Sequence, residues 1–242
     1  REPVLRLGKM ITDRVPIKLG FEKLTADSPE YWGLAPICTD EQAEIALKMG
    51  VRKPKTLKQM VKITGMDEKE LEKQLEQMSF NGLLEYNWEN PEHEKQYVLP
   101  MFVPGSAEFT NMNSTVLEEH PEMGRFFERM SRLPLEKITP MVPPGGAGIG
   151  MHVIPVEKAI DMNNQAVSLE KISYWLDKYD GKYAASPCSC RKSRKTYDEG
   201  CADDPADWCI AVGDMADYVV ETGKGGRYIT KEEALEIFKK AE

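Results

Sequence analysis

The sequence has no long apolar run. No stretch of about 18 apolar residues occurs, so we expect no membrane-spanning helix. The first residues do not show the charged and then apolar pattern of a secretory signal, which favours a cytoplasmic protein. Hydrophobic residues make up 41% and charged residues 30% of the chain, as in an ordinary globular protein.

Positive charge is also in short supply. The chain has 32 Lys and Arg against 40 Asp and Glu, for a net charge of -8. Binding of phosphate groups requires a basic surface, so this balance disfavours nucleic acid as the main partner. Histidine is rare, and the three histidines lie at no metal-ligand spacing from one another or from a cysteine. We assign them no role.

Cysteine is scarce and unevenly distributed. Four of the five cysteines lie between positions 188 and 209, and Cys38 stands alone. Because the chain is long enough for a full-sized core and has no secretory signal, this clustering favours a metal or iron–sulfur site over disulfides. Cys38 is expected to be a small buried hydrophobic residue.

Composition and turn residues divide the chain into four parts. The predicted class is α+β, mostly helical: a winged helix-turn-helix domain followed by a small helical iron–sulfur domain with four cysteines. Position 1 is not Met and the last residues continue a good helix pattern, so we expect a piece of a larger protein. The parts are an N-terminal extension at 1–38, the winged-helix-like domain at 39–103, a Pro- and Gly-rich connecting region at 104–167, and the cluster-binding domain at 168–242.

The second part carries consistent helix and strand signals. Two Thr-x-x-Gln capping boxes, at 39–42 and 56–59, and a cap at Asp67 open three successive helices. Two apolar segments, 83–87 and 96–100, then read as strands joined by a polar loop. Three helices followed by a strand, a loop and a strand have the element order of a winged helix-turn-helix, a pattern that is specific for fold and weak for function.

The charge of the third helix argues against DNA reading. A winged helix that reads DNA places this helix in the major groove, against phosphate and base edges. Here the segment 66–79 carries five acidic residues and two lysines, so its face would repel DNA. The pattern favours a scaffold or docking module.

The connecting region predicts one helix, from Glu118 to Met130, and a glycine-rich loop at 143–150. The loop lacks the Gly-Lys-Ser/Thr ending of a phosphate-binding loop and does not form a dinucleotide fingerprint. We interpret it as a structural linker that covers the cluster or a partner's cofactor.

The clustered cysteines, Cys188, Cys190, Cys201 and Cys209, have the spacing C-x-C-x10-C-x7-C. The run 183–191 is predicted to be a strand that ends in a turn, from which two thiols project. Four thiolates suit either a [4Fe-4S] cluster or tetrahedral zinc. Zinc sites usually use paired C-x2-C to C-x4-C knuckles, whereas this chain has one tight C-x-C pair and two separate cysteines, which favours iron.

The residues around the cysteines fit an anionic cluster. A basic run at 191–195 follows the first pair, and we interpret it as a solvated loop that balances charge. Nearby cations would also raise the reduction potential of a cluster or dock an acidic electron carrier. After Cys209 we expect a helix over 210–223 and a last helix opened by a capping box at 230–233.

Several segments of the chain resemble a known family, namely 31–36, 150–155, 186–191, 200–201, 209–213, 216–218, 221–223, 226–227 and 230–235. They are similar to the N-terminal region of large FAD-dependent pyridine-nucleotide oxidoreductases of anaerobic bacteria, which carry [4Fe-4S] ferredoxin-type domains. The resemblance covers nearly the whole chain and implies that the four cysteines are cluster ligands. The flavin domain and further cysteine-rich segments that usually follow in that family are missing here, so neither flavin binding nor catalysis is expected of this chain.

These observations predict an iron–sulfur electron-transfer module of an anaerobic flavin-dependent oxidoreductase. One [4Fe-4S] cluster would relay electrons to flavin or ferredoxin-type domains of the same or a partner protein, and the module would not be catalytic alone. The alternatives are a winged-helix regulator whose iron–sulfur or zinc site acts as a sensor, and an interaction module with structural zinc. Identification of the metal separates these readings.

Overall fold

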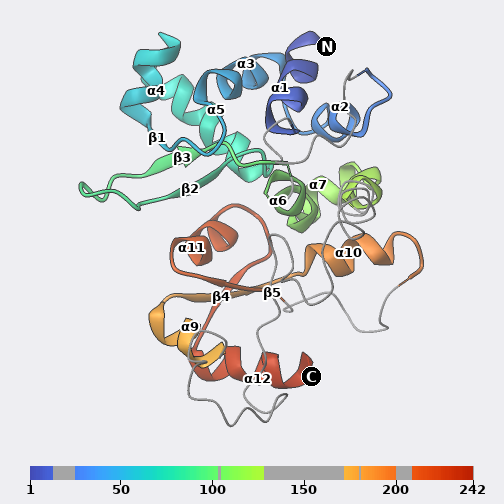
Figure 1. Ribbon diagram of the computed structural model, residues 1–242, viewed down its shortest axis with the longest axis vertical. Helices are drawn as coiled ribbons and strands as arrows, with labels where there is room; N and C mark the ends of the chain where they lie inside the picture. The colour runs from blue at the N-terminus through green and yellow to red at the C-terminus, as the bar shows by residue number, and fades with distance from the viewer. Residues whose placement is uncertain (13–24, 103–104, 128–171, 180, 200–208, 242) are drawn as a thin grey trace, which may run out of the picture.

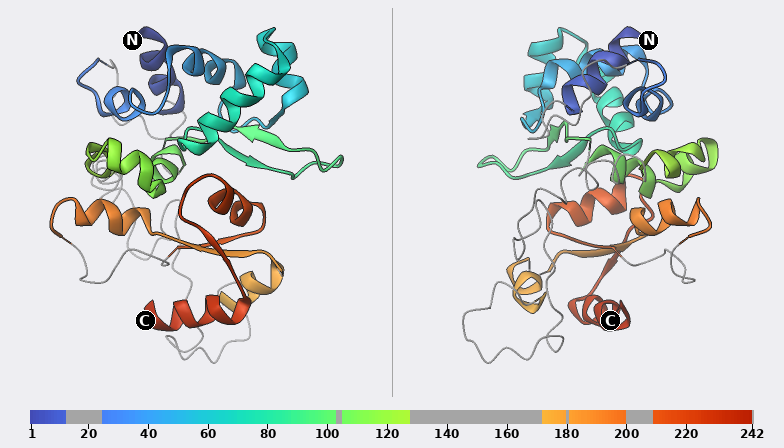
Figure 2. Two further views of the ribbon diagram at one scale, coloured as in Figure 1. Left: turned by 180° about the vertical axis from the view of Figure 1, so that it is seen from behind. Right: turned by 45° about the vertical axis from the view of Figure 1, so that its right-hand side comes forward.

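The chain is an α+β protein in which helices predominate over two small antiparallel sheets. The N-terminal helices and the first sheet form one end of the long axis, and the second sheet with α9 (Ile172–Lys178) and α12 (Lys231–Ala241) forms the other (Figure 1). α6 (Ser106–Met112), α10 (Ser189–Lys195) and α11 (Asp214–Glu221) lie between the two ends (Figures 1 and 2). A computed structural model describes residues 1–12, 25–102, 105–127, 172–179, 181–199 and 209–241.

Three capped helices build the first region, as predicted. α3 (Asp40–Met49) and α4 (Leu57–Thr64) each begin with a complete capping box, in which the Thr and Gln side chains bond reciprocally to backbone N–H groups. α5 (Glu68–Phe80) begins at Asp67, whose Oδ1 accepts from two backbone N–H groups of the first turn at 3.1 and 3.2 Å. Because these contacts are local in sequence, the helix starts could be read from the residue pattern alone.

The first sheet packs beneath these helices. The two predicted strands are confirmed as β2 (Glu85–Asn87) and β3 (Gln96–Val98), and a short strand that was not predicted, β1 (Lys55–Thr56), pairs with the other side of β3. Tyr86 and Tyr97 are buried partners across the ladder, with ring centroids 6.3 Å apart. The Tyr97 hydroxyl also bonds to a carboxylate of α5, which joins the sheet to that helix.

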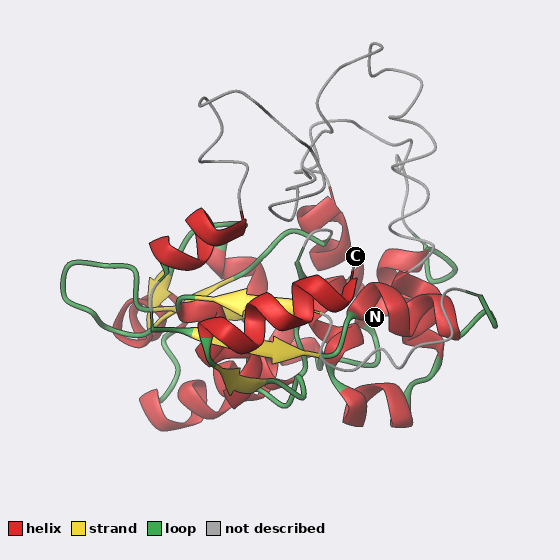
Figure 3. Cartoon of the chain, turned by 90° about the horizontal axis from the view of Figure 1, so that it is seen from below, coloured by secondary structure: helices red, strands yellow, loops and turns green. Residues whose placement is uncertain are grey.

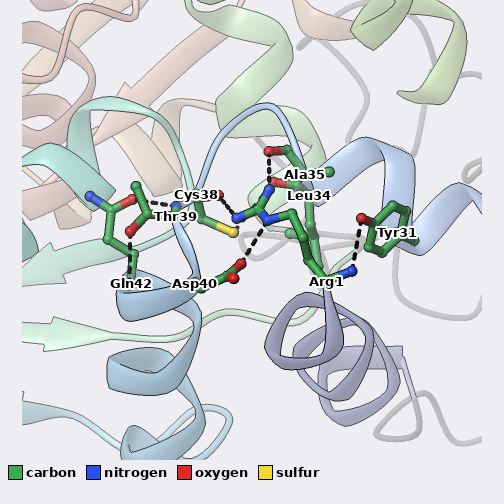
Figure 4. Close-up of polar contacts among 8 residues, drawn as sticks. All are labelled: Arg1, Tyr31, Leu34, Ala35, Cys38, Thr39, Asp40 and Gln42. Atoms are coloured by element: carbon green, nitrogen blue, oxygen red, sulfur yellow. Dashed lines mark hydrogen bonds and ion pairs between the residues drawn. The ribbon is translucent and has the colours of Figure 1, made fainter. Parts of the chain in front are cut away.

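The first 38 residues, expected to be an extension, contribute to the same core. α1 (Glu2–Thr12) buries one apolar face and packs against α3. Arg1 bonds to Asp40 Oδ1 at 2.6 Å and to the carbonyl oxygens of Ala35 at 2.7 Å and Cys38 at 2.6 Å (Figure 4). This guanidinium therefore holds the start of α1 against the segment that leads into α3.

The helix predicted over 118–130 is broken. α7 (Ser114–Glu119) ends at His120, whose φ and ψ are -133° and 69°, and a new helix covers 122–127. Pro121 explains the break, because proline disfavours the α conformation of the residue before it. The last three residues of the predicted helix lie outside the described part of the chain.

The second sheet has the order β5-β4-β6. Its central strand is β4 (Tyr183–Ser186), flanked antiparallel by β5 (Cys209–Val212) and β6 (Arg227–Ile229). Side chains of β4 alternate between two cores: Ala184 faces the large core shared with the first region, and Ala185 faces the small core beneath α9 and α12. Figure 3 looks from this end of the molecule, with α12 in front of the strands.

β5 corrects the helix predicted over 210–223. Residues 209–212 are extended because they pair with β4, and α11 begins only after Gly213, which has a φ of 62°. Ile and Val in this segment suit a strand once a partner strand is present. The last predicted capping box is confirmed, with Thr230 N donating to Glu233 Oε2 at 2.8 Å at the start of α12.

Two fully buried side chains tie the ends of the molecule together. Tyr218 of α11 donates to the carbonyl oxygen of Leu84 at 2.6 Å. Lys224 Nζ donates to the carbonyl oxygens of Ser79 at 3.0 Å and Phe80 at 2.7 Å, and to a third carbonyl near its own turn. These carbonyls close α5, whose last turn leaves acceptors without helical partners. The C-terminal region thus caps the first region from below.

Candidate metal centre

Strand pairing brings three of the four predicted ligands to one end of the second sheet. Cys209 is the first residue of β5 and pairs with Ser186, the last residue of β4. Two residues further on, Cys188 is the N-cap of α10, and Cys190 follows in the first turn of that helix. Cys201 lies in the segment 200–208, outside the described residues.

The three thiols interact, with Cys188 at their centre. The pKa of Cys188 is lowered, first by the thiol of Cys190 and then by that of Cys209, because both stabilise its thiolate. The pKa of Cys190 and of Cys209 is raised, first by the contact with Cys188 and then by burial. The Cys188 thiolate therefore repels a second negative charge and disfavours ionisation of the Cys190 and Cys209 thiols. A bound cation would relieve this repulsion and favour all the thiolates together.

Backbone N–H groups at the start of α10 face the same sulfurs. The N–H groups of Cys190 and Arg191 lower the pKa of Cys188, and the N–H of Ser189 acts in the same direction on Cys209. The first N–H groups of a helix have no partner inside the helix, so they are free to bond to thiolate sulfur. Such bonds stabilise anionic sulfur at a metal or cluster site.

Polar residues from α6 complete the surroundings. Asn111 is fully buried, and its Nδ2 donates to the carbonyl oxygen of Ser189 at the start of α10. The carboxylate of Glu108 raises the pKa of Cys190, and burial raises the pKa of Glu108 itself to about 7. Neither residue could be predicted from the sequence, because no spacing rule links Glu108 or Asn111 to cysteines so far along the chain.

The described residues do not by themselves form a finished ligand set. Within them, no group of three or more His, Cys, Asp or Glu side chains is arranged to hold a metal ion. Of the histidines, His93 and His120 are described away from the thiols and His152 is not described. Three interacting thiols, two of which accept backbone N–H groups, nevertheless fit the chemistry of a thiolate-bound cluster or zinc.

The basic run after the cysteine pair is a helix, which corrects the predicted loop. Its residues form α10, which packs against α6. Lys192 Nζ donates to the carbonyl oxygen of Met112 at 2.9 Å and to Ser114 Oγ at 3.0 Å, and burial lowers its pKa. Arg194 pairs with Glu199 at the end of the helix. Part of this positive charge therefore anchors the helix instead of facing solvent.

Cys38 is separate from this site, as predicted. It follows α2 (Pro29–Leu34), is buried, and its thiol donates to the carbonyl oxygen of Leu34 at 3.3 Å (Figure 4). Burial raises the pKa of Cys38 to about 12. The thiol is therefore neutral at physiological pH and acts as a small core residue.

Two other predictions concern regions beyond the cysteines. The glycine-rich loop at 143–150 lies outside the described residues. In the part of the chain that is described, no helix combines the length and the apolar character needed to cross a bilayer. Comparisons with protein-family models, with curated proteins and with solved structures gave no match.

Proposed function

We propose that Cys188, Cys190, Cys201 and Cys209 hold one [4Fe-4S] cluster, and that the chain is an electron-transfer module of an anaerobic flavin-dependent oxidoreductase. The observation that carries this proposal is the interaction of three thiols where β4, α10 and β5 meet. A bound cluster supplies one-electron chemistry. Its partners would be flavin or ferredoxin-type domains of the same or another chain.

The chain's own elements would hold the ligands in place. The β4–β5 pairing fixes Cys209 beside the end of β4, and α10 carries both Cys188 and Cys190. Cys201 would come from the segment that leads from α10 back to β5. Because α10 is bonded to α6 and β5 to β4, the three described thiols sit on rigid elements, which limits ligand movement during electron transfer.

Exposure indicates where an electron could enter or leave. Cys188 and Cys209 are half-buried, whereas Cys190 is exposed. A cluster with one ligand at the surface lies close to any redox partner that docks there. Lys195, the last residue of α10, is exposed and adds positive charge to this helix, which suits an acidic partner.

The first region would serve as a winged helix that docks and does not read DNA. Its order α3-β1-α4-α5-β2-β3, with a three-stranded sheet, supports this assignment. The acidic residues of α5 oppose phosphate binding, and the carbonyl end of α5 is already bonded to Lys224. The first region would therefore support the cysteine region and would not contact nucleic acid.

Metal analysis of protein purified without oxygen tests the proposal. We expect about four irons and four sulfides per chain, and an EPR signal that appears on reduction with dithionite. One zinc and no iron would overturn the electron-transfer role and indicate a structural zinc module. A Cys38→Ser variant is the matched control, because it removes a thiol away from the site and should keep its iron.

The regulator alternative has its own test. Fluorescence anisotropy with a labelled random-sequence DNA duplex at low salt would detect a winged helix that binds nucleic acid. We expect no binding, because of the acidic α5 and the net charge of -8. Binding that weakens steeply as salt is added would instead support the regulator.

A further inference from the structure

Ser186 has a buried hydroxyl that bonds to no group in the described part of the chain. The residue is 0% exposed, and its Oγ finds no hydrogen-bond partner among the residues described. Burying a hydroxyl without a partner costs free energy, and native proteins rarely leave such a group unmatched. The partner is therefore expected to be a group that is not part of the described chain.

The position of Ser186 identifies that group. Ser186 and Cys209 are directly opposite in the antiparallel ladder, so their side chains lie on the same face with Cβ atoms about 4.5–5.5 Å apart. Two residues later the chain reaches Cys188, whose sulfur interacts with Cys209. The Ser186 side chain therefore lies on the same face of the sheet as the Cys209 thiol, at the end of the strand that leads to Cys188.

The Ser186 hydroxyl can donate a hydrogen bond to a sulfur atom. A hydroxyl both donates and accepts, whereas a thiolate or sulfide sulfur only accepts. The other buried oxygen without a partner in the described chain, Asn111 Oδ1, is an acceptor and cannot serve an anionic sulfur. Ser186 is therefore the residue of this pair that is suited to an electron-rich cluster.

We propose that the Ser186 hydroxyl donates a hydrogen bond to a sulfur of the cluster beside Cys209 and so sets its reduction potential. This inference rests on the cluster proposed above. A donor to sulfur stabilises the more negative, reduced state more than the oxidised state, and so raises the potential. Ser186 is thus a positioning residue that acts on the cluster through its hydrogen bond.

The test is a redox titration of the anaerobically purified full chain, followed by EPR. We expect Ser186→Ala to keep its iron and to take up an electron about tenfold less readily, which is a shift of about 59 mV to lower potential for one electron. Ser79→Ala is the matched control, because it removes another fully buried hydroxyl, one bonded to Leu75 in α5. Its potential should equal that of the wild type.

If the alanine variant loses its iron, a second pair of variants still tests the inference. Ser186→Thr and Ser186→Val have nearly the same shape, but only Thr keeps the hydroxyl. A lower potential for Val than for Thr supports the inference. Equal potentials within this pair, or an unchanged potential in Ser186→Ala, overturn it while leaving the cluster intact. Absence of iron from the wild type overturns the proposed function itself, which separates the two failures.

Discussion

The two ends of the molecule differ in how their polar groups find partners. In the first region, Thr39, Thr56 and Asp67 close the helix starts through local contacts within one turn. In the cysteine region, Ser186 Oγ and Asn111 Oδ1 are buried without a partner in the described chain. The helix starts of the first region are closed by the chain itself, whereas these two oxygens of the cysteine region have no partner among the described residues, as expected if the proposed cluster lies beside them.

Ionisable groups with shifted pKa values occur in both regions, but they differ in kind. In the first region they include two buried tyrosines, Tyr86 and Tyr97, whose pKa values burial raises. Around Cys188 they are three interacting thiols and the buried carboxylate of Glu108. Such clusters of perturbed groups mark functional sites more often than scaffolds. The interacting thiols therefore support the metal centre that we propose at the junction of β4, α10 and β5.

The largest effect on this difference between the two regions is expected when the central thiol of the cysteine region is removed. Cys188→Ser should lose essentially all bound iron, because Cys188 contacts both neighbouring thiols and lies where β4 meets α10. Iron and sulfide analysis after anaerobic purification measures the loss. Cys38→Ser should retain the metal of the wild type. If Cys188→Ser kept its full iron content, the metal would have to lie elsewhere.

A second test weakens the buried contact between the two ends of the molecule. Lys224→Met removes the ammonium group that bonds to two carbonyls at the end of α5, those of Ser79 and Phe80, and to the carbonyl of Thr222. We expect the free energy of unfolding to fall by about 1–3 kcal/mol, because buried carbonyl groups are left without donors. Lys182→Met is the control, since that exposed lysine pairs with Asp217 at the surface and should cost less than about 1 kcal/mol. The free energies of unfolding are measured by urea titration. Equal decreases in the two variants would contradict a stabilising role of Lys224 between the two ends.

The same lysine predicts a pH dependence. Burial lowers the pKa of Lys224 from its ordinary 10.5 to about 7 in the folded protein. Between these values the unfolded chain binds more protons than the folded chain, so stability rises with pH and is lost as pH falls through about 7. The free energy of unfolding of the wild type should therefore rise relative to Lys224→Met from pH 7 to 9. A constant difference would contradict the lowered pKa.

The smallest effect is expected in the scaffold. Thr39→Ala removes the hydroxyl that accepts from Gln42 N at 3.1 Å at the start of α3. Loss of such a cap lowers the free energy of unfolding by about 1 kcal/mol. Thermal unfolding measures the change, and iron content should stay at the wild-type value. Loss of iron in this variant would show that the two regions are less independent in function than their contacts indicate.

Local signals explain what the sequence could predict of the fold. The starts of α3, α4, α5 and α12 were predicted correctly because caps bond within one turn. β5 was predicted as a helix because its residues Ile210 and Val212 also fit an apolar helix face, and only pairing with distant β4 makes them a strand. β1, β6 and α10 likewise depend on partners that no local pattern shows.

The candidate site also combines residues that a local pattern identifies with residues that only the fold brings together. The spacing of the cysteines directed attention to Cys188, Cys190 and Cys209, which the fold brings into contact. Glu108, Asn111 and Ser186 could not be assigned from spacing, because strand register and the packing of α6 on α10 place them there. Spacing in the sequence thus singles out the cysteines, whereas the residues packed around them can be identified only from the fold.

The most direct test of the central claim is X-ray absorption of the anaerobically purified chain at the iron and zinc edges. We predict an iron edge, with iron surrounded by sulfur and with further iron atoms as the next neighbours. Zinc bonded to four sulfurs at about 2.3 Å, with no iron, would contradict the electron-transfer account.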